Sequence, residues 1–476
     1  MFDILLPDQD DRPLYQQLYM QIRDQIRSGR IDNGVRLPSV RALQLQLNIS
    51  KTPIETAYQM LTAEGYVVSR PRSGLYVENS HKHPTGVLDA KDNNFQGKLT
   101  SNMSKSTPVL HTKLIDFDPT VPDQHTFPAR IWSKTQKEAI ENHLDMIGKY
   151  GDAQGEYELR FAIADYLRAS RGVNCQAEQI IIGSGIAYSI GIVTKLLRDI
   201  HRVAMEEPGY NLVRDQFMLN GCEIFPIPFD DKGLSLTDLE ASAAQMVYVT
   251  PSHQFPTGSI MPYPERERLL KWAIARNAYI IEDDYDGEFR YLGKPIPSLQ
   301  GLDTHGRVIY IGTFSKALTP ALRMNYMVLP PKLIAQLSAM PHEVVFAPSR
   351  VEQWAMQSFI EQGHWYRHIR KVRNLYRKKH HHLIELIQAY LGNHVEITGQ
   401  NAGLHIQLTV KKPQTPEELV TSAARAGVKI YDFQKMWVHQ KRHSTEYPKV
   451  YLGFAGVSFA DMETGIRLLQ KAWFTD

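Results

Sequence analysis

The chain has 476 residues, of which 22% are charged and 43% hydrophobic, and its formal net charge is +3. This length predicts two or three domains, and the composition is typical of a globular protein. Cys175 and Cys222 have no Cys/His neighbours at metal-ligand spacing, which argues against a zinc site or a disulfide framework. The start of the chain lacks signal-peptide features, and no apolar stretch approaches the ~20 residues of a membrane span. We therefore expect a cytoplasmic protein.

Three zones follow one another along the chain. Residues 12–78 carry apolar residues at helical spacing. Residues 79–114 are polar and without periodicity, which predicts a flexible linker. From residue 115 to 476, short apolar runs such as "QIIIG", "QMVYVT" and "AYIIED" alternate with helix-length segments. This alternation predicts an α/β domain with a mostly parallel sheet.

The first zone predicts three helices and a hairpin. The first helix would carry Leu14, Leu18, Ile22 and Ile26 on one stripe. The second would begin at the cap Ser39 and end at Asn48. The third would start with a capping box, Thr52-Pro53-Ile54-Glu55, with the proline at the first helical position. "VVSRPRSGLYV" then reads as two strands around a basic turn, which completes a winged helix-turn-helix whose third helix enters the major groove of DNA.

Charge is consistent with a DNA-facing surface in this zone. Residues 12–77 hold nine Lys/Arg against four Asp/Glu. The alternative is a structural three-helix domain with a solvated basic face. The side chains predicted to contact DNA lie at the second turn, the third helix start and the wing: Arg36, Ser39, Arg41, Ser50, Lys51, Thr52, Arg70 and Arg72.

This zone resembles the GntR family of bacterial regulators. The matching segments are "PLYQQLYMQIRDQIRSG", "RLPSVRAL", "ISKTPIETAYQMLTAEGY" and "RSGLYV". The resemblance places Arg41 where the family has a DNA-contacting arginine. Glu55 departs from the basic or amide residue that is commoner there, and an acid could cap the helix or read a cytosine edge.

In the third zone, "GTFSKALTPALRMNY" places Lys316 after an apolar run and next to hydroxyl residues. Such a lysine can form a Schiff base with an aldehyde cofactor. The "GSG" turn before a helix would bind phosphate, and Arg323 would add a bidentate contact. Asp283 and Tyr285 share one face at the end of "AYIIEDDYD", where a carboxylate could hold a pyridine nitrogen and a hydroxyl could donate to a phenolate. His253 and Gln254 add polar donors from a Pro/Gly loop, although an acidic loop or a divalent-metal site would also fit the run of acids.

Ligands bind at the carboxyl ends of strands in open α/β sheets, so these segments are expected to converge. Together they resemble the aspartate-aminotransferase-like, fold-type I domain that binds pyridoxal 5′-phosphate (PLP). The matching segments are "QGEYELRFAIADYLRASRGV", "EEPGYNLVR", "YVTPSHQFPTGSIMP", "IIEDDYDGEFRY" and "GTFSKALTPALRMNYMVLPP". With the N-terminal zone, the chain resembles the MocR/GabR subfamily of GntR regulators.

The resemblance implies a role for each matching residue. Lys316 would be the catalytic, cofactor-linked lysine, Asp283 the partner of the pyridine nitrogen, Tyr285 the donor to the phenolate oxygen and Tyr210 the stacking ring. The phosphate cradle would be formed by Arg323, Ser184, Gly185, Thr313 and Ser315, with Ile186 standing where a hydroxyl residue is common. The resemblance also implies a head-to-tail homodimer, with Tyr150 as a candidate contact to the partner's phosphate.

Two positions bear on the effector. In the GABA-responsive member, arginines that hold a carboxylate stand at the positions of Leu212 and Tyr447, which argues against GABA here. Lys449, Arg442 or a partner-subunit residue could replace them. Three hypotheses remain: a regulator that answers an amine or amino-acid effector, an aminotransferase with a DNA-binding appendage, and a regulator that senses PLP itself.

Overall fold

The computed structural model describes residue 4 and residues 13–70, 73–78, 114–230, 233–291, 297–340, 347–438 and 447–474. Its internal contacts divide the chain into two units, Met1–Val109 and Leu110–Asp476. Apart from Leu114, the predicted linker lies outside the described residues. Arg72 and Arg442 also lie outside them.

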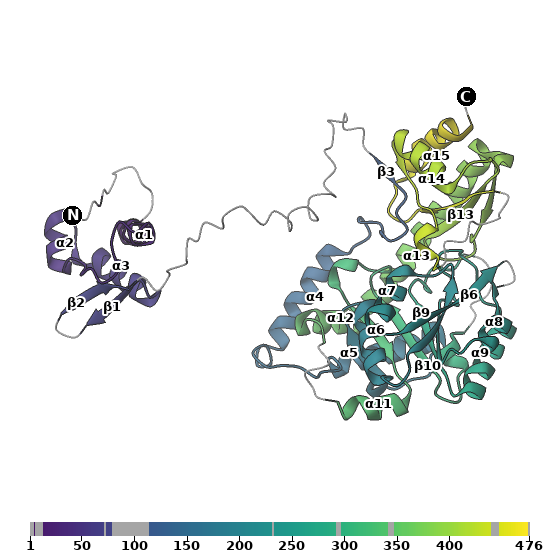
Figure 1. The fold of residues 1–476 in the computed structure, drawn as a ribbon, viewed down its shortest axis with the longest axis horizontal. Coiled ribbons are helices and arrows are strands. Elements are labelled where there is room, and N and C mark those ends of the chain that lie inside the picture. Colours follow the sequence, from purple (N-terminus) through teal and green to yellow (C-terminus); the bar gives the residue numbers. More distant parts are fainter. Residues whose placement is uncertain are drawn as a thin grey trace, which may run out of the picture. The chain divides into compact units, whose positions relative to one another are not determined.

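The first unit consists of three helices and a hairpin, as predicted (Figure 1). Its elements are α1 (Leu14–Arg27), α2 (Val40–Leu47), α3 (Lys51–Ala63), β1 (Val67–Arg70) and β2 (Gly74–Val77). The two strands pair antiparallel, with Arg70 opposite Gly74. Leu18, Ile22 and Ile26 of α1 are at most 1% exposed, whereas Leu14 is 41% exposed. The four residues share one stripe of α1, and its first member stays exposed because the side chain of the first helical residue points back beyond the helix start.

The helix ends of this unit confirm one prediction and correct another. Ser39 caps α2 by accepting a hydrogen bond from the Ala42 N–H at 3.1 Å, and Asn48 ends that helix at a φ of 53°. The predicted capping box of α3 is wrong, because the helix already begins at Lys51, after Ser50. Glu55 instead forms an ion pair with Lys51, with 2.9 Å between Oε1 and Nζ.

The second unit is built on an eight-stranded sheet with the order β4-β11-β10-β9-β8-β5-β6-β7. β11 is antiparallel to both of its neighbours and β7 is antiparallel to β6, while the other neighbouring pairs are parallel. The prediction of a mostly parallel sheet is confirmed. The strands are β4 (Ile180–Gly183), β5 (Arg202–Glu207), β6 (Glu223–Asp230), β7 (Gly233–Leu234), β8 (Met246–Val249), β9 (Tyr279–Asp284), β10 (Val308–Thr313) and β11 (Asn325–Val328).

Helices cover both faces of this sheet. Successive residues of a strand point to opposite faces, and both sets are apolar here, so each face needs a covering layer. Ile281 and Ile311 pack in one cluster with residues of α6, α7 and α11, whereas Ile280 and Val308 pack in another with residues of α8 and α9. Tyr310 and Val328 pack toward α5, α12 and α13. These helices and the neighbouring α4 and α10 have the following bounds: α4 (Ala129–Asn142), α5 (Tyr157–Arg171), α6 (Ile186–Leu196), α7 (Asn211–Leu219), α8 (Leu236–Ala241), α9 (Tyr263–Arg276), α10 (Leu299–Leu302), α11 (Pro331–Ser338), α12 (Arg350–Glu361) and α13 (His364–Tyr390).

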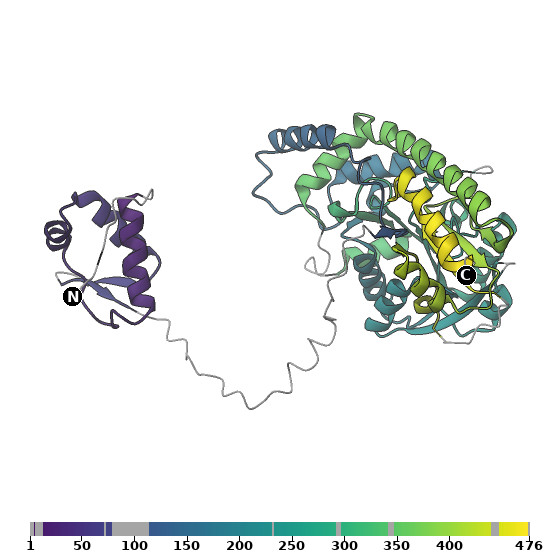
Figure 2. The same cartoon turned by 90° about the horizontal axis from the view of Figure 1, so that it is seen from above.

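A smaller sheet, β12-β13-β15, completes the second unit, with β14 paired to β3 beside it. Helices α13 and α15 run side by side in this part (Figure 2). The elements of this part are β3 (Ile115–Asp116), β12 (Val395–Thr398), β13 (His405–Val410), α14 (Pro416–Arg425), β14 (Val428–Lys429), β15 (Lys449–Gly453) and α15 (Phe459–Phe474). Short 3-10 turns η5 (Gly392–His394) and η6 (Gln434–Met436) lie in this part, whereas η2 (Ala177–Gln179) precedes β4 and η3 (Pro320–Leu322) lies between β10 and β11. Among the described residues, no helix combines the length and apolar character needed to cross a membrane.

Candidate functional site

Lys316 follows the carboxyl end of β10, on the loop that precedes η3. Its Nζ donates to the backbone oxygen of Thr120 at 2.9 Å. Burial lowers the pKa of Lys316 to about 8, against the opposing influence of Asp286, Asp118 and Asp283. A lysine with such a pKa has a substantial neutral fraction near pH 8, and a neutral amine is the nucleophilic form.

Asp283 lies near the end of β9, in the centre of the large sheet, with 6% of its surface exposed. Its Oδ2 accepts a hydrogen bond from the Tyr248 hydroxyl at 2.5 Å. Burial raises the pKa of Asp283 to about 7. A cationic pyridine nitrogen against this carboxylate would favour its charged form, so the site fits the group that the sequence implies. Tyr248 was not predicted, although a hydroxyl inside the apolar run "QMVYVT" was a signal for it.

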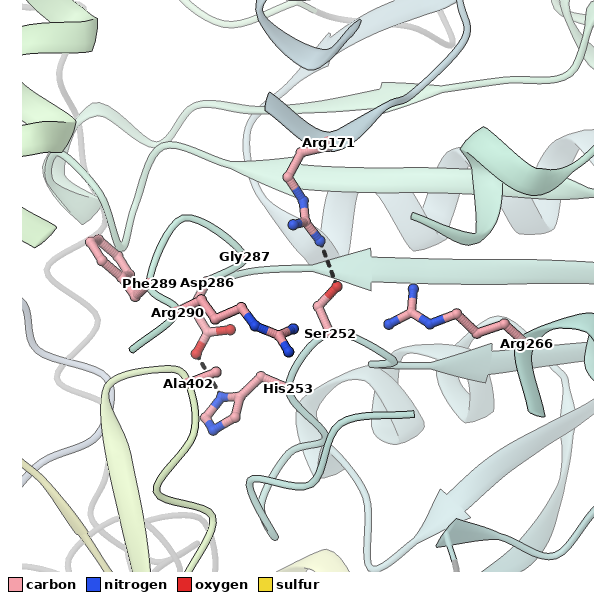
Figure 3. A pocket seen from close by; sticks show the side chains of 9 residues that line it. All are labelled: Arg171, Ser252, His253, Arg266, Asp286, Gly287, Phe289, Arg290 and Ala402. Carbon is pink, nitrogen blue, oxygen red and sulfur yellow. Dashed lines mark hydrogen bonds and ion pairs between the residues drawn. The ribbon is translucent and has the colours of Figure 1, made fainter. Parts of the chain in front are cut away.

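Tyr285, His253 and Asp286 form a small hydrogen-bonded group. The Tyr285 hydroxyl donates to the His253 backbone oxygen at 3.0 Å. His253 Nδ1 lies 2.8 Å from Asp286 Oδ2 (Figure 3) and 3.0 Å from the Tyr285 hydroxyl. The carboxylate contact assigns the proton to Nδ1, and the buried Nε2 has no partner within the described part of the chain. Asp286 thereby fixes the ring that positions the Tyr285 hydroxyl.

Gln254, in contrast, is used by its own loop. Its Nε2 donates to the backbone oxygens of Pro208 and Phe255, at 2.9 and 2.8 Å. Its Oε1 accepts from the N–H and hydroxyl of Thr257. With 1% of its surface exposed and its amide donors bonded to backbone oxygens, Gln254 shapes the loop. The sequence predicted a polar donor at Gln254, but a sequence pattern does not show which groups the side chain contacts.

The start of α6 and Arg323 lie against each other, where the sequence predicts an anion cradle. Gly185 precedes α6 with a φ of 129°, and its N–H donates to Asn325 Oδ1 at 2.9 Å. A Cβ at Gly185 would lie 2.5 Å from Arg323 Nη2, which itself donates to the Ser184 oxygen at 3.1 Å. The backbone conformation therefore requires glycine, and a Cβ here would also displace the end of the Arg323 side chain. The helix N-terminus and an exposed guanidinium together suit a phosphate.

The other cradle residues lie around this turn. Thr313 and Ser315 are half-buried, and Thr313 Oγ1 accepts from the Ser315 N–H at 3.1 Å. Ile186 packs on the apolar cluster beneath α6 and brings no hydroxyl. Asn325 was not predicted; an amide within the apolar run "RMNYMVL" marked it.

Tyr210 ends the segment after β5 and lies on the Asp283 side of the site. Its ring meets that of Phe255 edge to face, with centroids 5.3 Å apart. Burial raises the pKa of Tyr210; Asp283 raises it further and Arg323 lowers it, so this ring lies within the electrostatic reach of both groups. A half-buried ring in this position can cover a planar cofactor.

A small cavity lies next to these residues, at the ends of the strands (Figure 3). Its lining is Arg171, Ser252, His253, Arg266, Asp286, Gly287, Phe289, Arg290 and Ala402. Arg171 bonds to Asp284 Oδ2 at 2.5 Å and to the Ser252 hydroxyl at 2.7 Å. Arg266 donates to three backbone oxygens of the surrounding loops. Both guanidinium groups therefore hold the acidic end of β9 and its neighbours in place.

In the first unit, the predicted DNA contacts are on the surface. Seven of the eight are described, and all seven are exposed: Arg36, Ser39, Arg41, Ser50, Lys51, Thr52 and Arg70. Arg70 lies over the Tyr76 ring at 4.4 Å, which orients its guanidinium on the hairpin. The Ser39 hydroxyl is engaged as a helix cap, and Lys51 pairs with Glu55.

Comparisons with known proteins agree with this two-part structure. The family of bacterial regulatory proteins called gntR matches residues 14–77, and aminotransferase class I and II matches residues 114–437. YdeL of Bacillus subtilis, an uncharacterized HTH-type transcriptional regulator, is 42% identical over 97% of both chains. MocR of Rhizobium meliloti, a probable rhizopine catabolism regulatory protein, is 33% identical over 99% of this chain and 96% of that protein.

Among solved structures, the multiple substrate aminotransferase of Thermococcus profundus is similar. It has a TM-score of 0.69 and 25% identity, covering 76% of this chain and 91% of that one. In this chain a GntR-type unit thus precedes an aminotransferase-type unit. The similarity to relatives that are named as regulators covers nearly the whole length of both chains. The chain belongs to the aminotransferase class I and II family and, with its GntR-type unit, to the MocR/GabR subfamily of transcriptional regulators.

Proposed function

We propose that this chain is a PLP-dependent regulator that binds operator DNA through residues 13–78 and answers a small amine or amino acid, or PLP itself, at Lys316. The observation that carries the proposal is a half-buried lysine at the strand ends, with its pKa lowered to about 8 and with Asp283 within its electrostatic reach. Bound PLP would supply an electrophilic aldehyde and an electron-withdrawing ring.

Each residue of the site would bind a different part of that cofactor. Lys316 would take its aldehyde end, and Asp283 would accept a hydrogen bond from its ring nitrogen. Tyr285, whose single hydroxyl proton is donated to the His253 backbone oxygen here, would turn that proton to the phenolic oxygen when the cofactor is bound. Arg323 and the α6 start would bind the phosphate, with Ser184, Thr313 and Ser315 around it. Tyr210 would cover the ring and exclude water from one side.

The DNA-binding half rests on the start of α3 and the hairpin. Exposed basic side chains at α3, α2 and β1 suit a helix docked in the major groove with a wing on the backbone. Such contacts to phosphates position the protein, and side chains at the α3 start would read base edges. A bacterial regulator must reach the chromosome, which lies in the cytoplasm, so we propose a cytoplasmic protein.

We also propose a homodimer. Large apolar side chains from α4 to α5 are exposed in the single chain: Ile131, Leu144, Ile147, Tyr150, Tyr157 and Phe161. Exposed apolar residues on this scale suit a surface that a second copy covers. Fold-type I sites lie at such interfaces, so Tyr150 of one chain would reach the partner's phosphate cradle.

Leu212 and Tyr447 favour keeping a second candidate, a regulator of the same kind that senses PLP alone. Leu212 is 44% exposed on α7, and Tyr447 is half-buried before β15. Neither can pair with an effector carboxylate, whereas cofactor binding needs neither of them. The aminotransferase alternative is disfavoured, because relatives of nearly the same length are named as regulators.

The test measures DNA binding by the purified full-length protein with and without PLP and amines. The probe is a duplex that the protein itself selects from a random-sequence pool, followed by fluorescence anisotropy. We expect a visible absorption band with PLP that is absent in Lys316→Ala, and a DNA affinity that changes with the occupancy of that lysine. A DNA affinity indifferent to PLP and to every amine would overturn the proposal. A change with PLP alone would select the second candidate.

A further inference from the structure

Basic charge in the second unit is concentrated in the long helix α13. Its residues 364–384 include seven Arg or Lys and five His, but no Asp or Glu. The whole chain has a net charge of only +3, so the residues outside this segment together carry −4. A segment of one sign on an otherwise acidic background produces a local field that attracts polyanions.

Five of these basic side chains are exposed on one face of α13, which we call the basic face of α13. They recur at helical spacing: Arg367, Arg370, Lys371, Arg377 and Lys378. The opposite face of the helix is buried through residues such as Trp365, Val372 and Tyr376. Because the apolar face is already covered by the core, α13 is not free to insert into a membrane surface, and only its charged face is open to a partner.

The basic face of α13 forms no ion pair within the described part of the chain. The ion pairs of this helix there join Lys379 to Asp123 and His381 to Glu385, and neither base belongs to the basic face. Where basic-face side chains do make hydrogen bonds, the acceptors are neutral. Arg367 donates to the Gln362 oxygen and to His364, at 3.0 and 2.8 Å, and Arg377 donates to Asn374 at 3.4 Å.

Acids on the helices around α13 are paired with bases of their own. Asp165 of α5 acts on Tyr366, Glu138 of α4 acts on His364, and Glu463 of α15 accepts from Tyr390. Their ion-pair partners are Arg168, Lys134 and Arg467, at 2.8, 3.6 and 2.8 Å. The positive charge of the basic face therefore stays uncompensated, and it is available to an anionic partner.

A groove of about 300 Å³ between α13 and α5 continues the basic face. Arg370 and Arg373 line it from α13. Arg373 Nε donates to the Glu288 backbone oxygen at 2.8 Å, which fixes the guanidinium in the lining. The Glu288 carboxyl accepts from the Tyr166 hydroxyl at 2.9 Å, and burial raises its pKa to about 7, so this acid opposes an anion only weakly. Two arginines beside an open groove suit a phosphate group.

We infer that the basic face of α13 is a second DNA-contacting surface, which holds the phosphate backbone of duplex outside the segment that the first unit reads. The inference rests on the proposed function, because the first unit makes DNA the polyanion that is held close to this chain. From Arg367 to Lys378 the face extends about 17 Å, and that length of duplex carries about five phosphates on each strand. Contacts of this kind add affinity and salt dependence without reading bases.

The experiment compares two duplexes on the full-length protein. One is the selected site alone, about 20 base pairs long, and the other is the same site within about 80 base pairs of unrelated sequence. Fluorescence anisotropy between 50 and 200 mM salt gives the affinity and the salt slope for each. We expect the long duplex to bind about tenfold or more tightly than the short one at 50 mM salt, with a steeper salt slope, because it adds phosphate contacts.

A triple variant of the basic face tests the assignment to α13. Arg367→Gln, Lys371→Gln and Lys378→Gln together remove three charges and keep a similar helix propensity. On the long duplex the salt slope should flatten by about two to three units, since each lost contact contributes about 0.9. Binding to the short duplex should stay unchanged, which also shows that the variant is folded.

The matched control removes three exposed charges elsewhere on the same unit. Lys195→Gln, Arg198→Gln and Lys332→Gln lie on or next to α6 and α11 and make the same change in net charge. This control should leave the salt slope on both duplexes as it is in the unsubstituted protein.

Equal losses on the long duplex in the two triple variants would assign the effect to net charge and overturn the inference. Equal affinity and slope of the unsubstituted protein on the two duplexes would overturn it as well. So would a basic-face variant that keeps its DNA binding but loses regulation in a transcription assay, because that result would assign the face to an acidic protein. In each case the proposed function stands. If the protein selects no duplex from the random pool, the proposed function itself fails.

Discussion

The two units of this protein use charge in opposite ways. In the DNA-binding unit the basic side chains of interest are exposed, as at Arg36, Arg41 and Lys51. At the strand ends of the aminotransferase-type unit the charges are buried against one another, as in the ion pair of Arg171 and Asp284, whose side chains are 9% and 1% exposed. Exposed charges act through long-range attraction and are nearly independent, whereas buried charges depend on their partners. Substitutions should therefore separate the units by the size and kind of effect.

Removing one partner of the buried pair should have the largest effect. Arg171→Ala leaves Asp284 uncompensated at the end of β9, which typically costs about 3–5 kcal/mol in the free energy of unfolding. Arg168→Ala on the same helix is the matched control, because Arg168 is 54% exposed and its pair with Asp165 contributes about 0–1 kcal/mol. Urea unfolding of both variants measures the difference. Equal losses would show that burial does not distinguish these pairs.

The phosphate cradle should be nearly as sensitive. Gly185→Ala places a Cβ 2.5 Å from Arg323 Nη2 and strains a backbone at a φ of 129°. Displacing a charge-assisted contact of this kind costs about 1.5–3 kcal/mol, so PLP affinity should fall about tenfold to a hundredfold. Gly191→Ala, further along α6 with nothing within 4 Å of the added Cβ, should leave PLP affinity unchanged. Absorption titration with PLP measures both, and a normal affinity for Gly185→Ala would remove Arg323 from the cradle.

The lowered pKa of Lys316 should be visible in a pH profile. Because burial lowers the pKa of Lys316 to about 8, its reactive neutral form increases as pH rises through 8 and is lost below it. The rate at which the cofactor-free protein takes up PLP should therefore rise with pH and level off above about 8. An ordinary lysine would still be gaining reactivity near pH 10. A profile that keeps rising to pH 10 would contradict the buried environment, and Lys316→Ala supplies the background rate.

The same contrast explains what could be predicted from the sequence. Helix stripes, the "GSG" turn and the strand-end acids are local patterns, so the winged helix and the convergence of Lys316 with Asp283 followed from them. The partners that set the charge of the site are not local: Tyr248 is 35 residues from Asp283, and Thr120 is 196 residues from Lys316. Only the fold brings these together. Side-chain direction was equally hidden, as Gln254 shows, and the helix start at Lys51 was missed because Ser50 precedes a stronger-looking capping motif.

The smallest effects should come from the exposed pair at the α3 start. Lys51→Ala removes one phosphate contact, so the slope of DNA affinity against salt should flatten by about one unit. Glu55→Gln frees Lys51 from its partner at 2.9 Å and should instead strengthen binding to DNA of any sequence by a few-fold. Anisotropy between 50 and 200 mM salt measures both, and Lys134→Ala in the second unit is the control, because its exposed pair with Glu138 has the same i,i+4 geometry outside the DNA-binding unit. If Lys51→Ala and Lys134→Ala leave the same slope, α3 does not enter DNA by its N-terminal end. If Glu55→Gln weakens binding to the selected duplex alone, the acid reads a base, and the ion pair is broken on DNA.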